Sequence, residues 1–159
     1  MHAEAIRLIE ELQLHVHPEG GYYREVFRSS SYVISAAGAQ RSAMTSIYYL
    51  LDGGSFSNWH RLDADETWHF YCGSPLTLTI IDPAGNLSTR TLSAHGPWQT
   101  TIALNAHFAA HVADESGYAL VGCNVAPGFE FADFHLATRA ILTAAYPQHA
   151  AVIARYART

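Results

Sequence analysis

The chain has 159 residues, of which 49% are hydrophobic and 14% charged, a balance that favours a folded globular protein over a disordered one. Its formal net charge is -5 with only 9 Lys and Arg residues, which excludes the basic surface that nucleic-acid binding requires. Apolar runs such as Ile47–Leu51 are far shorter than the ~20 residues that cross a bilayer, so no membrane segment is expected.

The first predicted element is a helix over Ala3–Leu14. Its apolar residues recur at helical spacing, with charged residues between them, which is typical of an amphipathic surface helix. The helix should end before His17, because Pro18 follows it and the residue before a proline is restricted to extended conformations. The turn Pro18–Gly21 leads into the next part of the chain.

The middle of the chain, from Tyr22 to about Phe134, is predicted to form an antiparallel sandwich or barrel. It is rich in aromatic and β-branched residues, and turn residues interrupt it roughly every 8–12 positions. The composition of Asp82–Asn86 predicts a hairpin connection. The candidate strands are Tyr22–Arg28, Ser46–Leu51, Glu66–Cys72, Leu76–Ile81, Leu87–Leu92, Thr100–Leu104, Phe108–Val112 and Tyr118–Val125.

Helical spacing returns near the end of the chain, over Thr138–Tyr146 and Ala150–Tyr156, with Pro147 between them. Since no linker composition interrupts the chain, residues 1–159 are expected to form a single domain. The first residues lack the layout of a signal peptide, and the two cysteines lack the density of a secreted scaffold. We therefore expect a cytoplasmic protein with free thiols.

The segment from Gly54 to Gly73 contains the most informative polar residues, and it is predicted to form two strands joined by a polar turn. Side chains alternate along a strand, so Glu66 shares one face with Trp68 and Phe70. If His60 points into the barrel, Glu66 can meet it there. Such a pair is typical of a metal half-site or an acid–base pair, and a satisfied structural pair at the barrel mouth is the alternative.

This segment resembles the first signature of the cupin superfamily, in which a glycine, two histidines, a glutamate and a second glycine follow at fixed spacing. Gly54, His60, Glu66 and Gly73 occupy four of the five places, and Leu62 stands where the second histidine would be. The second signature, Pro-x-Gly-x-x-His, should fall over 104–109 and is absent. His107 is a candidate to replace its histidine in part, because it shares a strand face with the position of that ligand, Ala109.

Over nearly its whole length the chain resembles a small cupin branch described as a domain of unknown function. The resemblance implies a double-stranded β-helix, a cupin jelly-roll barrel, with helices at both ends and pairing into a homodimer. It implies no established reaction. The matching segments are His17–Tyr23, Ser46–Leu51, Trp59–Leu62, Asp65–Phe70, Leu120–Cys123 and Val125–Phe131.

An apolar and aromatic pocket that binds a small molecule is expected around His60 and Glu66. Trp68 and Phe70 are expected to line it, with aromatic core packing as the alternative. His107 and Tyr23 are further candidates for binding the ligand. Glu19 is expected at the pocket rim or in a pair with an arginine.

Three functions stay open at this point. The leading one is binding of a sugar-like or carboxylate-bearing metabolite, which the protein would hold, isomerise or epimerise. His60 would then be the general base, Glu66 would orient or stabilise its ring, and Tyr48 or Tyr23 would return the proton.

The other two functions are a metal-dependent oxygenase and a non-catalytic binding module. A first-row metal prefers two or more histidines with a carboxylate, and Leu62 and Ala109 remove two of the four usual cupin ligands. No cofactor is therefore expected, although weak metal binding at His60 and Glu66 stays open. Whether the protein is an enzyme is not decided by the sequence.

Overall fold

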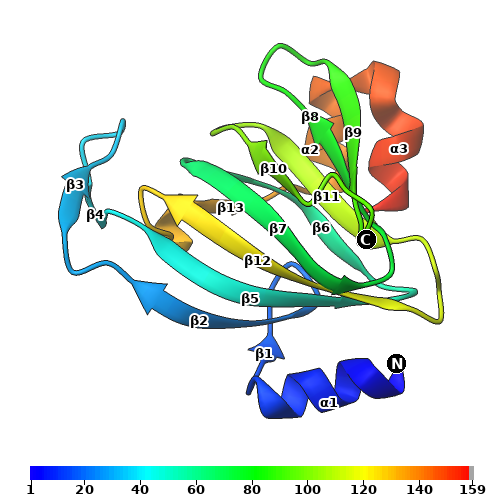
Figure 1. The fold of residues 1–159 in the computed structure, drawn as a ribbon. Coiled ribbons are helices and arrows are strands. Elements are labelled where there is room, and N and C mark those ends of the chain that lie inside the picture. The colour runs from blue at the N-terminus through cyan, green and yellow to red at the C-terminus, as the bar shows by residue number, and fades with distance from the viewer. Residues whose placement is uncertain (158–159) are drawn as a thin grey trace.

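The computed structural model describes residues 1–157, which form two antiparallel sheets that curl around a common core (Figure 1). The larger sheet has the strand order β1-β2-β5-β12-β7-β10, and the smaller has the order β13-β6-β11-β8-β9. The predicted double-stranded β-helix is confirmed. The strands are β1 (His15–Val16), β2 (Tyr22–Arg28), β3 (Tyr32–Ile34), β4 (Gln40–Ser42), β5 (Thr45–Asp52), β6 (Phe56–Leu62), β7 (Asp65–Gly73), β8 (Leu76–Ile81), β9 (Leu87–Leu92), β10 (Gln99–Ile102), β11 (His107–Val112), β12 (Tyr118–Ala126) and β13 (Phe134–Leu136).

The predicted strands are confirmed with small changes at their ends, and the predicted hairpin over Asp82–Asn86 joins β8 to β9. β10 ends at Ile102 and not at Leu104, because the backbone N–H of Leu104 leaves the sheet and donates to Asp65 Oδ1 at 2.8 Å. Four short strands, β1, β3, β4 and β13, were not predicted. Each has only two or three residues, too few for a periodic pattern.

Helices cover the outer faces of both sheets. α1 (Ala3–Glu11) packs Ala5 and Leu8 against Leu50 and Leu120 of the larger sheet. At the other end of the chain, η1 (Phe131–Asp133), α2 (Arg139–Ala145), η2 (Pro147–His149) and α3 (Ala150–Arg155) follow β12. Leu142 of α2 packs in the cluster that covers the smaller sheet. No helix among the described residues is long and apolar enough to cross a membrane.

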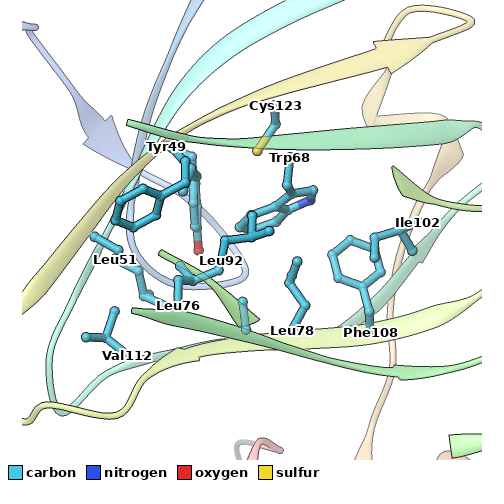
Figure 2. Close-up of a cluster of buried hydrophobic side chains, with 14 of the residues drawn as sticks. Tyr49, Leu51, Trp68, Leu76, Leu78, Leu92, Ile102, Phe108, Val112 and Cys123 are labelled. Atoms are coloured by element: carbon cyan, nitrogen blue, oxygen red, sulfur yellow. The ribbon is translucent and has the colours of Figure 1, made fainter. Parts of the chain in front are cut away.

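The main core fills one part of the space between the two sheets. Figure 2 shows Tyr49, Trp68 and Cys123 projecting from the larger sheet toward Leu78 and Phe108 of the smaller one. The same three residues of the larger sheet also line a cavity at the other part of the barrel. The closely packed core therefore forms one wall of this cavity and holds its side chains in place.

The hairpin of β3 and β4 projects away from the barrel, at the end where β2 finishes and β5 begins (Figure 1). Its base is attached to η1 by Arg41, whose guanidinium contacts both carboxylate oxygens of Asp133 at 2.6 and 2.7 Å. A bidentate pair of this kind fixes relative orientation as well as distance. The hairpin and the segment around η1 are therefore linked.

Candidate functional site

A cavity of about 150 Å³ lies between the sheets and contains the residues that the sequence singled out. His60 on β6 and Glu66 on β7 both line it, which agrees with the predicted alternation along these strands. Five of its polar side chains are buried: His17, Glu19, Thr45, His60 and Glu66. Its aromatic wall consists of Tyr23, Tyr49, Trp68, Phe129, Phe131 and Phe134.

Glu19 lies at the centre of the polar cluster, and the expectation that it sits at the rim or pairs with an arginine is wrong. Its Oε2 atom is 3.2 Å from His60 Nε2 and 3.5 Å from His17 Nδ1, and the residue is only 5% exposed. Two glycines after Glu19 turn the chain back onto the barrel. A Cβ on Gly21, whose φ is +72°, would come within 2.7 Å of the Leu50 carbonyl oxygen, so only glycine fits there.

Two hydrogen bonds hold this turn against the strands. The Tyr49 hydroxyl donates to the Gly20 carbonyl at 2.8 Å, and the Asn58 N–H donates to the Glu19 carbonyl at 2.8 Å. The backbone of Glu19 is thus fixed to β5 on one side and to β6 on the other. Its carboxyl group is thereby positioned before any ligand arrives.

The hydrogen bonds of the two imidazoles indicate where their protons lie. His60 Nδ1 is 2.7 Å from the Asn58 carbonyl oxygen, which can only accept, so Nδ1 carries a hydrogen. His60 Nε2 then faces Glu19 Oε2, and this contact needs one proton, on either the ring or the carboxyl group. His17 Nδ1 accepts a hydrogen bond from the Glu19 N–H at 3.3 Å, so this nitrogen carries a lone pair and no hydrogen.

Burial makes the uncharged forms of these groups favourable. It lowers the pKa of His60, against the opposing effect of Glu66, and it lowers the pKa of His17. Burial also raises the pKa of Glu19. It raises the pKa of Glu66 to about 7, an effect that the nearby Glu19 carboxylate strengthens and His60 opposes. The cluster therefore holds protons that can move near neutral pH.

Two buried polar atoms beside this cluster make no hydrogen bond of good geometry among the described residues, although the Trp68 and Cys123 side chains lower the pKa of Glu66. They are Glu66 Oε2 and Trp68 Nε1, an acceptor and a donor on one face of β7. A buried polar atom without a partner costs about 1–3 kcal/mol. Among the described residues His107, His111 and Thr143 also have such an atom outside the cavity, so it is the position of Glu66 and Trp68 in the cavity lining that connects them to a ligand. Both residues line the cavity, so a ligand or water bound there can supply the missing partners.

Arg28 stands at the cavity mouth with its hydrogen-bonding groups already occupied. It contacts Glu130 at 2.7 Å, Glu25 at 2.8 Å and the Phe129 carbonyl oxygen at 3.0 Å. Two carboxylates thus neutralise this guanidinium and hold it in place. Its positive charge is not directed at the interior of the cavity.

The prediction that Tyr48 faces the site is wrong, because Tyr48 and Tyr49 alternate along β5. Tyr48 packs in the cluster under α1, with its ring centroid 6.0 Å from that of Tyr71. Tyr49 is the residue that lines the cavity, together with Ile47 two positions earlier. Tyr23, the alternative proton donor, does line it.

His107 also faces away from the cavity, which corrects the prediction that it binds the ligand. Residues 108, 110 and 112 of β11 point into the core, so His107 and Ala109 point toward the C-terminal helices. The His107 ring centroid lies 6.0 Å from that of Tyr146. Phe70 shares the face of Glu66 as predicted, but it is buried in the core and does not line the cavity.

Several cavity residues were not predicted. His17 was interpreted as a turn residue, and Tyr49 could not be distinguished from Tyr48 by the apolar pattern of β5. The wall formed by Phe129, Phe131 and Phe134 comes from the segment after β12. For His17 the sequence did contain a signal: His17 and Glu19 are two positions apart, in a segment that ends in two glycines.

The donor atoms of the cavity do not fit the metal site that many cupins contain. At the two remaining ligand positions of the signatures, Leu62 lines the cavity with an apolar side chain, and Ala109 points out of the barrel. No group of three or more His, Cys, Asp or Glu residues in 1–157 is arranged to hold a metal ion. We therefore derive no reaction step through a metal.

Comparison with known proteins gives consistent results. A family model described as "Cupin superfamily (DUF985)" matches residues 6–137. A solved structure of a hypothetical protein from Leishmania major is 39% identical, with a TM-score of 0.92 and 100% of both chains covered. A structure from Shewanella oneidensis is 38% identical, with a TM-score of 0.87, covering 99% of this chain and 98% of the other.

More distant structures share the fold alone. Oxalate decarboxylase from Bacillus subtilis is 15% identical to this chain, with a TM-score of 0.59. The match covers 91% of this chain and 37% of that enzyme. No curated protein matches the chain.

Proposed function

We propose that this chain, which belongs to the cupin superfamily in the family described as DUF985, binds a small polar metabolite in its barrel cavity. The observation that carries the proposal is that Glu66 Oε2 and Trp68 Nε1 make no hydrogen bond of good geometry among the described residues, beside the contact between Glu19 and His60. The size of the cavity sets a limit on the ligand. A cavity of about 150 Å³ can hold a molecule of roughly the size of benzene.

The charge of the cavity favours one of the two ligand classes suggested by the sequence. Its lining includes Glu19, Glu25, Glu66 and Glu130. Arg28 is the one Lys or Arg residue that lines it in the described part of the chain, and it is already paired. A carboxylate-bearing ligand would therefore meet like charges and few free donors. A ligand without a carboxylate is the better match.

Proton transfer is the reaction that these side chains support best. The pair of Glu19 and His60 can accept a proton, and Glu66 in its acid form can donate one near neutral pH. Removing a proton from a carbon next to a carbonyl and returning it elsewhere isomerises a sugar-like substrate, and returning it to the opposite face epimerises it. Both reactions leave the number of protons unchanged and need no cofactor.

The test is a ligand-observed NMR screen of small sugars and hydroxycarbonyl compounds, followed by thermal melting with the best binder. At 100 times Kd, binding should stabilise the wild type by about 2.7 kcal/mol. His60→Ala should keep the fold and lose most of this stabilisation, because it removes one partner of the central polar pair. His135→Ala, on the surface strand β13, is the control and should retain it.

The results for His60→Ala and for deuterium exchange show whether the ligand binds in this cavity and whether the protein turns it over. If His60→Ala keeps the full ligand-induced stabilisation, the ligand does not bind in this cavity and the proposal is wrong. If binding is lost as expected, incubation of the binder with wild-type protein in deuterated water tests turnover. Deuterium on the carbon next to the carbonyl would support proton transfer, and its absence would leave a binding protein without catalysis.

A further inference from the structure

We propose that the ligand of this cavity is a small organic ammonium ion, whose N–H groups contact Glu66 and Glu19 and whose apolar part lies against the phenylalanine wall. This inference rests on the proposed function, since it assumes that the barrel cavity binds a metabolite. It goes further because it assigns the charge of the ligand and the side chains that select it.

The first argument is the balance of charge inside the cavity. Arg28 forms ion pairs with Glu25 and Glu130 at the cavity mouth, so its positive charge is already compensated there. Glu19 and Glu66 remain deeper inside, where the neighbouring groups are histidines whose neutral forms burial favours. Among residues 1–157, no lysine or second arginine lines the cavity. Burial also favours the protonated acids in the free protein, so a cationic ligand would bind together with ionisation of Glu66 or Glu19 and would compensate the charge that forms.

The second argument is the unpartnered oxygen of Glu66. This residue is only 7% exposed, and its Oε2 atom makes no hydrogen bond of good geometry within the described part of the chain, although Trp68 and Cys123 lie close enough to lower the pKa of its carboxyl group. An ammonium group carries up to three N–H donors and no acceptor. It can therefore donate to Glu66 and to Glu19, whereas a carboxylate or phosphate would bring only further acceptors to this end of the cavity.

The third argument is the aromatic wall. The ring centroids of Phe129, Phe131 and Phe134 lie 5.1 to 6.3 Å from one another, so the three rings form one continuous surface. The His17 ring continues it, 5.7 Å from Phe134. Aromatic faces attract cations and also bury the hydrocarbon part of an organic amine. Acidic groups beside aromatic rings are a combination that suits an organic cation.

Binding should depend on pH in a direction that follows from this arrangement. The pKa of Glu66 is about 7 in the free protein, and a bound cation favours its ionised form, so binding releases a proton. Affinity should therefore rise about tenfold from pH 6 to pH 8. The other titratable or charged groups that line the cavity are His17, Glu19, Tyr23, Glu25, Arg28, Tyr49, His60, Cys123 and Glu130. Loss of protons from Glu19, His17 or His60 would act in the same direction.

The experiment compares three probes that share a ring and differ in charge: cyclohexylamine, cyclohexanol and cyclohexanecarboxylate. Isothermal titration calorimetry at pH 8 should give at least tenfold tighter binding for the amine than for the alcohol, and the weakest binding for the carboxylate. The Trp68 indole N–H resonance should shift on binding, which locates the probe in the cavity. Repeating the amine titration at pH 6 tests the expected proton release.

A pair of variants tests the role of Glu66. Glu66→Gln should weaken binding of the amine at least tenfold and change binding of the alcohol by less than threefold, because it removes charge with little change of shape. Glu10→Gln, on the exposed face of α1, removes a charge far from the site and should change neither.

Each contrary result has a distinct meaning. Equal or tighter binding of the alcohol or the carboxylate overturns the ammonium assignment, and so does an unchanged amine preference in Glu66→Gln. If only the alcohol binds and shifts Trp68, the cavity still binds a metabolite and only the charge of that ligand is wrong. If no probe binds, the ammonium assignment fails, and the separate NMR screen with His60→Ala decides the proposed function.

Discussion

Glu19 and Glu66 share one cavity but have different surroundings. Glu19 lies 3.2 Å from an imidazole nitrogen, while one oxygen of Glu66 makes no hydrogen bond of good geometry among the described residues. In the free protein an ionised Glu66 would therefore be a buried charge that is only partly compensated, which explains why its pKa is raised to about 7. This residue should dominate the response of the empty site to pH.

Replacing Glu66 by glutamine should change how stability depends on pH. Its pKa rises from an ordinary value of 4.5 to about 7 in the folded protein. Between these values the folded state holds a proton that the unfolded state has lost, so the free energy of unfolding falls as pH rises. The total fall is about 3 kcal/mol. Glutamine cannot ionise, so Glu66→Gln should match the wild type near pH 4 and exceed its stability at pH 8 by up to this amount.

Urea unfolding at pH 4 and pH 8 measures this difference directly. The exposed-face variant Glu10→Gln serves as the control and should parallel the wild type at both values. The buried histidines act in the opposite direction, because burial lowers the pKa values of His17 and His60, but they are common to all three proteins. Parallel pH profiles for the wild type and Glu66→Gln would show that Glu66 is ionised without cost, and would contradict its placement.

Among the elements, the end of β7 depends on a glycine that the cupin signature contains. Gly73 has φ of +105°, and a Cβ there would lie 2.2 Å from the Tyr118 carbonyl oxygen, a backbone atom of the adjacent strand. Ser74 N–H donates to that same oxygen at 2.6 Å. The two strands thus approach closely where β7 ends, and any side chain would force them apart. This gives a structural reason for one residue of the signature.

Gly73→Ala should therefore destabilise the protein by about 2–5 kcal/mol, from backbone strain together with the steric conflict. Gly38 is a matched control, since its φ is +82° and a Cβ there would meet no atom within 4 Å. Gly38→Ala should cost only the backbone strain, about 1–2 kcal/mol. Chemical unfolding of the two variants separates the two effects. Equal losses of stability would mean that the strands can move apart at little cost.

The accuracy of the predicted side-chain directions depended on what covers each strand. On β7 polar and apolar residues alternate, so the inward direction of Glu66 and Trp68 was predictable. β5 is apolar on both faces, because its outer face packs under α1 through residues such as Leu50. The choice between Tyr48 and Tyr49 therefore had no basis in the local pattern.

The cavity itself was predictable only in part. His60 and Glu66 follow from a motif with fixed spacing, but Glu19 reaches them from a segment that precedes the first long strand. Its position depends on a turn through Gly20 and Gly21 and on hydrogen bonds to residues far along the chain, such as Tyr49. Contacts between segments so distant in sequence leave no periodic pattern that a single sequence could reveal.

At the scale of the whole molecule, the projecting hairpin and the neighbouring sheet edge expose apolar side chains. Tyr32 and Ile34 of β3 are 64% and 68% exposed, and Phe27 of β2 is 49% exposed. Within residues 1–157, the outer edge of β2 pairs with β1 only at Tyr22 and Tyr23, so the remainder of this edge has no strand beside it. Open edges with apolar side chains readily pair with another chain.

We therefore predict that the protein is a homodimer in which this hairpin and the edge of β2 face the second copy, as the family resemblance also implied. Light scattering at micromolar concentration should give twice the mass of one chain. Ile34→Lys places a charge in the apolar surface and should shift the protein toward the monomer, because burying an unpaired ammonium in an interface is costly. Ile141→Lys is a matched control, since Ile141 is 64% exposed. It lies on α2, on the other side of the barrel from the hairpin of β3 and β4 (Figure 1). It should leave the mass unchanged.

Loss of the dimer should also weaken ligand binding, because Arg41 links the hairpin to the segment that bears Phe131. If the wild type is a monomer, both the predicted dimer and its effect on ligand binding are wrong.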